Sequence, residues 1–211
     1  KPYMMYVPYT LWEDAGQVSV AAEKAHRVGA HLVASFPLLP LGPVREGLKQ
    51  LIPTLLQTAD GVQITNIGDL EFLPRELPQN FLVCGDLSFN VTNQESAQVL
   101  KKVGVQVLTI SPEAQGLNLE QLAGEVIVEG PIPLMRTRHC MLRKDKPHCG
   151  LCKNGNKWYT ITDGHGVSYP VIPKPKDCQN IILSPGIFPV HPDALRAASL
   201  KRINILKEFN P

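Results

Sequence analysis

Four cysteines in the last third of the chain have the residue type and spacing of a metal site. Their order is Cys140-x8-Cys149-x2-Cys152-x25-Cys178. The C-x-x-C pair can place two thiolates on one metal because the intervening turn brings both sulfurs inward, and the outer two cysteines then close the shell. Thiolate donors favour zinc or an iron-sulfur cluster and exclude Mg²⁺ and Ca²⁺.

The spacing alone leaves zinc and a [4Fe-4S] cluster nearly level. The segment between Cys152 and Cys178 resembles a zinc ribbon, but the gap from Cys140 to Cys149 is too long for the ribbon's second knuckle. The chain has five cysteines, an odd number that is a poor basis for a disulfide framework, so we expect clustered thiols in a reducing compartment. The fifth, Cys84, lies in an apolar strand and is expected to be a buried small hydrophobic residue.

The segment that carries the first three of these cysteines is strongly basic. Between Arg136 and Lys157 it has seven Lys or Arg residues and one acid, although the formal net charge of the whole chain is only +2. A polyanion such as RNA is one expected partner; cations that stabilise the thiolates, or a solvated surface, are the alternatives. The candidates for substrate binding are Arg136, Arg138, Arg143 and Lys144.

Short apolar runs that alternate with helical patterns indicate how these residues are positioned. Such alternation is typical of βα units around a parallel sheet, with helices on both faces or around a barrel. The expected strands are Met4–Val7, His31–Phe36, Gly61–Thr65, Phe81–Cys84, Val105–Ile110 and Glu125–Val128. The expected helices are Val18–Val28, Val44–Thr58, Glu95–Val103 and Leu119–Ala123, the third of them capped by Asn93 and ended before Gly104.

Polar residues follow the carboxyl ends of these strands, where α/β folds place their functional groups. They are Asn66, Asp86, Asn90, Glu113 and Glu129. We expect Asp86, Asn90 and Glu113 to be the polar groups nearest a substrate, as candidate catalytic residues. The alternative for each residue is ordinary turn chemistry.

The character of the chain changes after Gly130, so we expect two domains, residues 1–130 and 131–211. Trp158–Thr162 and Val167–Val171, separated by Asp-Gly-His-Gly, predict a β-hairpin inserted next to the cysteines. The remaining expected elements are a strand at Asn180–Ser184, a helix near Pro192–Leu200 and an apolar run at Ile203–Leu206.

Other signals are negative. No apolar run approaches the ~18 residues of a membrane span and the first residues lack the pattern of a signal peptide, so we expect a soluble, cytoplasmic protein that does not enter a membrane. Nucleotide-binding glycine motifs, H-E-x-x-H and G-x-S-x-G are missing. The chain begins at Lys1 and enters a strand-like run at once, which suggests a piece of a longer protein.

Several short motifs follow one another in a distinctive order along the chain. They are Ile64-Thr65-Asn66-Ile67-Gly68-Asp69-Leu70, Gly85-Asp86-Leu87-Ser88-Phe89-Asn90-Val91-Thr92-Asn93, Thr109-Ile110-Ser111-Pro112-Glu113 and Gly130-Pro131-Ile132-Pro133-Leu134-Met135, followed by the four cysteines and the hairpin. As an ordered set, over roughly residues 60 to 190, this resembles the U-32 collagenase-like peptidase family. The resemblance implies the later half of a TIM-like barrel, hence a partial parallel barrel with a cysteine-bearing β-hairpin insertion near the C-terminus.

The resemblance also implies chemistry. Some members of the family are described as peptidases or collagenases, and others take part in hydroxylation of tRNA or ribosomal RNA bases or of ubiquinone and carry a [4Fe-4S] cluster on four cysteines. It therefore favours the cluster over zinc, with Cys140, Cys149, Cys152 and Cys178 as ligands. Thr137-Arg138-His139 departs from the family by replacing an acid with a base.

The leading hypothesis is thus an iron-sulfur component of RNA base hydroxylation. The alternatives are a peptidase and a non-enzymatic interaction module stapled by a metal. A half barrel would expose a sheet edge, so we expect the rest of the barrel, another subunit or a second copy of the chain to cover it.

Overall fold

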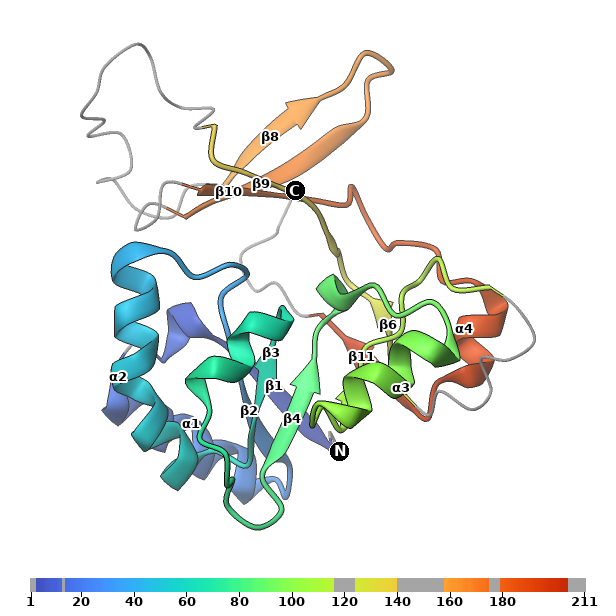
Figure 1. The fold of residues 1–211 in the computed structure, drawn as a ribbon. Helices are drawn as coiled ribbons and strands as arrows, with labels where there is room; N and C mark the ends of the chain where they lie inside the picture. The colour runs from blue at the N-terminus through green and yellow to red at the C-terminus, as the bar shows by residue number, and fades with distance from the viewer. Residues whose placement is uncertain (1–2, 13, 116–123, 140–157, 175–178, 205–211) are drawn as a thin grey trace. The chain divides into compact units, whose positions relative to one another are not determined.

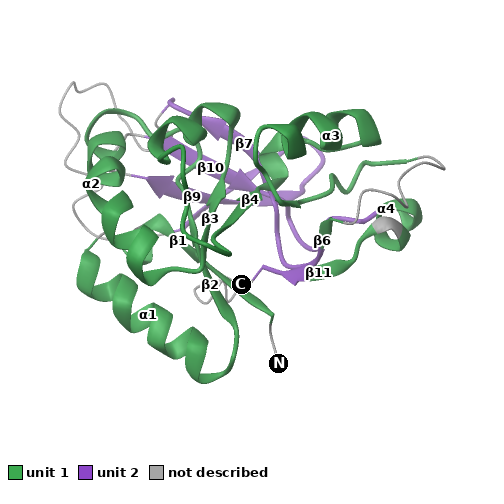
Figure 2. Ribbon diagram, turned by 60° about the horizontal axis from the view of Figure 1, so that its bottom comes forward, with its two compact units in different colours: residues 1–126, 191–201 green, residues 127–190, 202–211 purple. Residues whose placement is uncertain are grey.

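A computed structural model describes residues 3–12, 14–115, 124–139, 158–174 and 179–204 (Figure 1). The chain divides into two compact units, residues 1–126 with 191–201 and residues 127–190 with 202–211 (Figure 2). Each unit has its own principal sheet. The predicted helix Leu119–Ala123 and the second half of the predicted run Ile203–Leu206 lie outside the described residues.

The first unit is built on a parallel sheet of five strands in the order β1-β2-β3-β4-β5. This confirms the predicted α/β class and the predicted parallel sheet. The strands are β1 (Met4–Pro8), β2 (His31–Ser35), β3 (Gly61–Ile64), β4 (Leu82–Gly85) and β5 (Val107–Leu108). Closure of the sheet into a barrel stays a prediction.

The fifth and sixth strands differ from their predicted forms. β5 has two residues where Val105–Ile110 was expected, because Thr109 and Ile110 form isolated parallel bridges with Glu125 and Val91. The sixth strand, β6 (Glu125–Glu129), pairs with β11 (Leu200–Ile203) in a two-stranded sheet.

The first unit has three main helices, and local chemistry explains where the first and third begin and where the third ends. They are α1 (Ala15–Arg27), α2 (Gly42–Thr58) and α3 (Gln94–Lys102). The Asp14 carboxylate accepts from Gly16 N at 2.6 Å, and the Asn93 side chain accepts from Ser96 N at 2.8 Å, as predicted for the third helix. Gly104 ends α3 with φ +101°, a conformation that glycine adopts without strain.

The two faces of the parallel sheet differ in chemistry. Consecutive strands are neighbours and right-handed crossovers are the rule, so the helices are expected on one face. One set of alternating residues is apolar and buried, for example Leu32, Val62 and Val83. The other set includes Ser35 and Gln63, which share a register row. Sequence periodicity alone does not reveal this polar row, because the strands are too short and too apolar.

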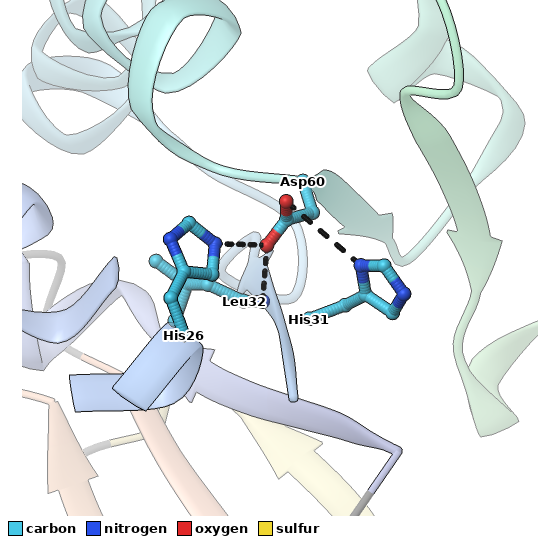
Figure 3. A network of polar contacts seen from close by, with 4 residues as sticks. All are labelled: His26, His31, Leu32 and Asp60. Carbon is cyan, nitrogen blue, oxygen red and sulfur yellow. Dashed lines mark hydrogen bonds and ion pairs between the residues drawn. The ribbon is translucent and has the colours of Figure 1, made fainter. Parts of the chain in front are cut away.

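At the amino-terminal end of the sheet, the Asp60 carboxylate joins three segments (Figure 3). Its Oδ2 accepts from Leu32 N at 2.7 Å and lies 2.7 Å from His26 Nε2, while Oδ1 lies 3.8 Å from His31 Nδ1. The two imidazoles lie on opposite sides of the carboxylate (Figure 3). This arrangement suits a structural clamp between α1, β2 and the start of β3, at the end of the sheet where α/β folds carry stability rather than catalysis.

The second unit contains a four-stranded antiparallel sheet in the order β7-β10-β9-β8. Its strands are β7 (Pro133–Thr137), β8 (Tyr159–Thr162), β9 (Ser168–Lys174) and β10 (Gln179–Leu183). The β8–β9 hairpin confirms the predicted antiparallel pair. β7 was not predicted, because Pro131 and Pro133 disfavour a strand; it lies at the sheet edge, where proline is tolerated.

One further helix follows the second sheet in the sequence. α4 (Pro192–Ala197) is shorter than the predicted Pro192–Leu200, because Leu200 already belongs to β11. The helices among the described residues include none that is both long and apolar enough to cross a membrane.

Candidate functional site

The three candidate catalytic residues lie on the loops that follow β4 and β5. Asp86 is half-buried and precedes a short 3₁₀ helix, Leu87–Phe89, and Asn90 ends that helix in the left-handed conformation with φ +47°. Glu113 is exposed, and its N–H donates to the Ser111 hydroxyl at 3.3 Å. The left-handed conformation of Asn90 is the turn chemistry that asparagine tolerates well. The catalytic roles of all three stay predictions.

The Asn66 loop after β3 is organised by a buried carboxylate that the sequence did not single out. Asp69 is 2% exposed, and its Oδ2 accepts from Thr65 N at 2.7 Å, the Thr65 hydroxyl at 2.9 Å and Asn66 N at 3.2 Å. Its Oδ1 accepts from Asn66 Nδ2 at 2.9 Å. Asn66 therefore has a structural role at this strand end. A signal for it was present, because the Asn-x-x-Asp spacing fits a helix start.

Hydrogen bonds also tie successive loops at this end of the sheet to one another. The Ser88 hydroxyl donates to Thr65 O at 2.5 Å, which joins the loop after β4 to the end of β3. Ser111 N donates to Val91 O at 2.9 Å, which joins the next pair of loops. These links hold the neighbourhood of Asp86 and Asn90 in place, as a preorganised site requires.

A second polar cluster was missed by sequence reasoning. Glu125 is 2% exposed; its Oε2 accepts from the Tyr6 hydroxyl at 2.8 Å, and its Oε1 lies 2.8 Å from Thr109 Oγ1. Tyr6 lies on β1, the first strand of the sheet, and Glu125 begins β6. The contact therefore links the first strand to the segment that follows the fifth. A local sequence pattern cannot predict a contact between two residues that are 119 positions apart.

Gln63, in the middle of β3, contributes a further buried polar group. It is 2% exposed, and its Oε1 accepts from the Ser35 hydroxyl at 2.8 Å. Its Nε2 has no hydrogen-bond partner within the described part of the chain. Its strand neighbour Cys84 is fully buried, as expected of a small hydrophobic residue.

A shallow groove lies between α2 and the 3₁₀ helix Ile67–Phe72. Its volume is about 430 Å³, and its lining is Arg45, Lys49, Ile52, Pro53, Glu71 and Phe72. The Arg45 guanidinium lies 4.8 Å from the centre of the Phe72 ring and pairs with Glu71, and Lys49 pairs with Glu46 at 2.9 Å. The charges of the groove are thus largely neutralised by neighbouring acids, which makes it a weak anion site.

The hairpin of the second unit has a tight polar turn around Asp163. Its Oδ1 accepts from His165 N at 2.8 Å and Val167 N at 3.0 Å, and its Oδ2 accepts from the Tyr169 hydroxyl at 3.1 Å. The Val167 N–H lowers the pKa of the Asp163 carboxyl most, aided by the His165 N–H and the Tyr169 hydroxyl. The same hydrogen bond to Asp163 raises the pKa of the Tyr169 phenol.

These shifts predict how the hairpin responds to pH. Asp163 is expected to titrate below 3.8 and Tyr169 above 10.0 in a carbon-detected NMR titration. A depressed carboxyl pKa stabilises the fold above its unfolded value, and that contribution is lost as the pH falls through the folded pKa. A raised phenol pKa stabilises the fold below its unfolded value, and that contribution is lost as the pH rises through the folded pKa.

Tyr169→Phe tests which group controls the turn. We expect the Asp163 pKa to rise but to stay below 3.8, because the Val167 N–H remains. A return to 3.8 would show instead that the phenol, and not the backbone, causes the shift.

The candidate ligands and substrate-binding residues divide between described and undescribed parts of the chain. Arg136 is half-buried on β7, and Arg138 is exposed just after it. Outside the described residues lie Cys140, Arg143, Lys144, Cys149, Cys152 and Cys178. Among the described residues, no group of three or more His, Cys, Asp or Glu side chains is arranged to hold a metal ion.

Comparisons with known proteins return one structural likeness. No family model and no curated protein matches the sequence. Among solved structures, the chain is similar to the U32 peptidase Mk0906, with 18% sequence identity and a TM-score of 0.48. The match covers 60% of this chain and 61% of that one, so it spans less than two thirds of the other structure's length.

Proposed function

We propose that the chain is an iron-sulfur protein of the U-32 type that takes part in the hydroxylation of RNA bases. The supporting observation is the topology of the four-stranded sheet. The strand ends that adjoin the four cysteines in the sequence all lie at one end of that sheet. Cysteines that adjoin strand ends at the same end of a sheet can bind one metal site through short connecting segments.

The pair formed by β7 and β10 adjoins the first and last cysteines in the sequence. Thr137, at the end of β7, lies opposite Asn180, near the start of β10. Cys140 follows Thr137 by three residues, and Cys178 precedes Asn180 by two. The Asn180 side chain is buried, and its Nδ2 donates to His139 O at 2.9 Å. The residue before Cys140 is therefore fastened to the residue two positions after Cys178.

The other two cysteines precede the outer strand of the same sheet. Cys149 and Cys152 come before β8, whose first residue, Tyr159, lies opposite Val171 on β9. β9 continues past Val171 to Lys174, which lies opposite Gln179 at the start of β10. Neighbouring strands of this sheet are antiparallel. One end of the sheet therefore carries the start of β8, the end of β9, the start of β10 and the end of β7.

The donor set fits a cluster. Four thiolates are the usual ligands of a [4Fe-4S] centre, and when bound such a centre would supply one-electron transfer. The chain's own basic residues complement it, because Arg136 and Arg138 lie next to Cys140 in the sequence and supply positive charge for an anionic substrate. The resemblance of the ordered motifs to the U-32 family favours iron-sulfur over zinc. RNA bases are among the substrates that it implies, and the basic segment Arg136 to Lys157 favours them.

Anaerobic purification followed by iron, sulfide and zinc analysis tests the cluster. We expect about four irons and four sulfides per chain and a broad visible absorption band. Cys149→Ser is expected to abolish both the iron content and the band. Cys84→Ala is the matched control, because Cys84 is a buried thiol of the parallel sheet, and it should leave the iron content unchanged.

Zinc in place of iron would overturn the proposal and support the metal-stapled interaction module. In that case chelation should unfold the second unit, since structural zinc contributes folding free energy directly. The peptidase alternative gains no support from the described residues, which contain no group arranged to bind a hydrolytic metal.

A further inference from the structure

We infer that a row of three side chains on the second unit's sheet, Arg136, Gln179 and Lys174, binds a phosphate group of the RNA backbone. The inference rests on the proposed function, because it assumes an RNA substrate, and it adds the contact that positions that substrate. The row lies at the sheet end that adjoins the cysteines in the sequence.

The strand register places these residues on one face. Gln179 on β10 lies directly opposite Lys174 on β9. The β10 residue Ile181 lies opposite Arg136 on β7, so Gln179 is the diagonal neighbour of Arg136. Cross-strand partners and residues two apart on a strand point to the same side of a sheet. Arg136, Gln179 and Lys174 therefore share a face across three adjacent strands, with the amide between the two cations.

The central amide has unused hydrogen-bonding capacity. Gln179 is 3% exposed, and its Oε1 has no hydrogen-bond partner in the described part of the chain. Native proteins leave few such atoms, because a buried polar atom without a partner is costly. The oxygen and nitrogen of a glutamine amide are exchanged by rotating the group. In the rotated state, Gln179 would present N–H donors where its oxygen now lies.

The row combines three kinds of hydrogen-bond donor that bind phosphate groups: a lysine ammonium, the N–H groups of an amide and an arginine guanidinium. Arginine offers paired donors that match phosphate oxygens, and lysine adds a compact positive charge. A carboxylate would be recognised less well, because it has fewer acceptor oxygens to meet donors from three strands. The row thus predicts a phosphodiester ligand, and Arg138 lies only two residues beyond Arg136 along the chain.

Fluorescence anisotropy with a labelled single-stranded RNA, measured at several salt concentrations on the protein as purified, tests this inference. Arg136→Gln and Lys174→Gln are each expected to weaken RNA binding about tenfold. Each should also make the fall of the log association constant with log salt concentration less steep, by about 1 in the slope. Lys102→Gln, which removes an exposed lysine of α3, is the matched control and should change neither quantity by a comparable amount.

Gln179→Met separates binding from packing. Methionine has a similar volume and no atom that needs a strong hydrogen bond, so a binding glutamine should give a variant with an unchanged or higher melting temperature and weaker RNA binding. A structural glutamine would instead give a lower melting temperature and unchanged RNA affinity, which would overturn the inference.

The outcomes also separate this inference from the proposed function. A protein that holds the cluster and binds RNA equally well with and without the row would overturn the phosphate assignment alone. A protein without iron whose RNA affinity depends on the row would refute the iron-sulfur assignment and leave the phosphate contact in place. Absence of RNA binding in the unaltered protein would overturn the inference outright.

Discussion

Replacing Asp69 with alanine is expected to lower the free energy of unfolding by about 3 kcal/mol, a large share of the roughly 5–15 kcal/mol that stabilises a typical domain. Asp69 is almost wholly buried and accepts four hydrogen bonds from Thr65 and Asn66. Two of the donors are backbone N–H groups, which cannot turn to find other partners. Urea unfolding followed by circular dichroism measures the change.

Asparagine at the same position sharpens this test. Asp69→Asn keeps the shape but turns one acceptor oxygen into a donor that faces the Asn66 amide or the backbone N–H groups, so we expect a loss of about 1–2 kcal/mol. Asp14→Ala is the matched control, because Asp14 is an exposed helix cap with one hydrogen bond to Gly16 N, and it should cost about 1 kcal/mol. A loss at Asp69 no larger than that at Asp14 would contradict the prediction.

A loss of Asp69 would also reach the candidate site. The Asp69 hydrogen bonds hold Thr65, whose carbonyl accepts from the Ser88 hydroxyl, and Ser88 lies between Asp86 and Asn90. If Asp69 is lost, Thr65 is held less firmly, and the loop after β4 that contacts it through Ser88 is expected to shift as well. Weaker RNA binding by Asp69→Ala would therefore be compared with its loss of unfolding free energy. Only a loss of binding without a loss of stability would indicate a direct role for the neighbouring Asp86.

The predictable parts of the fold are those with local causes. Apolar runs between turn residues gave the positions of β1 to β4, and the Asn93 cap and Gly104 gave the limits of α3 within one residue. β7 escaped because proline chemistry disfavours a strand, and only pairing with β10 makes it one. Tertiary pairing of this kind overrides local preference.

The candidate site was less predictable for the same reason. Asn66, Asp86, Asn90 and Glu113 were visible because they follow strand-like runs, whereas the only sequence signal that Asp69 organises one of these loops is its Asn-x-x-Asp spacing from Asn66. Gln63 lies inside an apolar strand, where a single polar residue gives no periodic signal. Its bond to Ser35 exists only because β2 and β3 are neighbours in that register.

Replacing Glu125 with alanine should produce the second large effect, a loss of about 2–4 kcal/mol in the free energy of unfolding. Alanine removes the acceptor of the Tyr6 hydroxyl and the partner of Thr109 Oγ1, and it leaves a small cavity beside the half-buried Tyr6 and the buried Thr109. Because Tyr6 belongs to β1, the variant should also loosen the first strand. A larger increase in the amide hydrogen exchange rate of β1 than of β4, each measured against the unaltered protein, would show this loosening.

Glutamine at position 125 distinguishes this site from Asp69. The groups that contact Glu125 through Tyr6 and Thr109 are hydroxyls, which can accept as well as donate, so an amide can be accommodated in either orientation. We therefore expect Glu125→Gln to cost less than about 1 kcal/mol, whereas Asp69→Asn, which opposes backbone N–H groups, costs more. A double-mutant cycle of Tyr6→Phe with Glu125→Ala should show a coupling of at least about 0.5 kcal/mol. Additive losses would mean that Tyr6 and Glu125 act independently, and the contact between the first strand and β6 would then contribute little to the stability of the first strand.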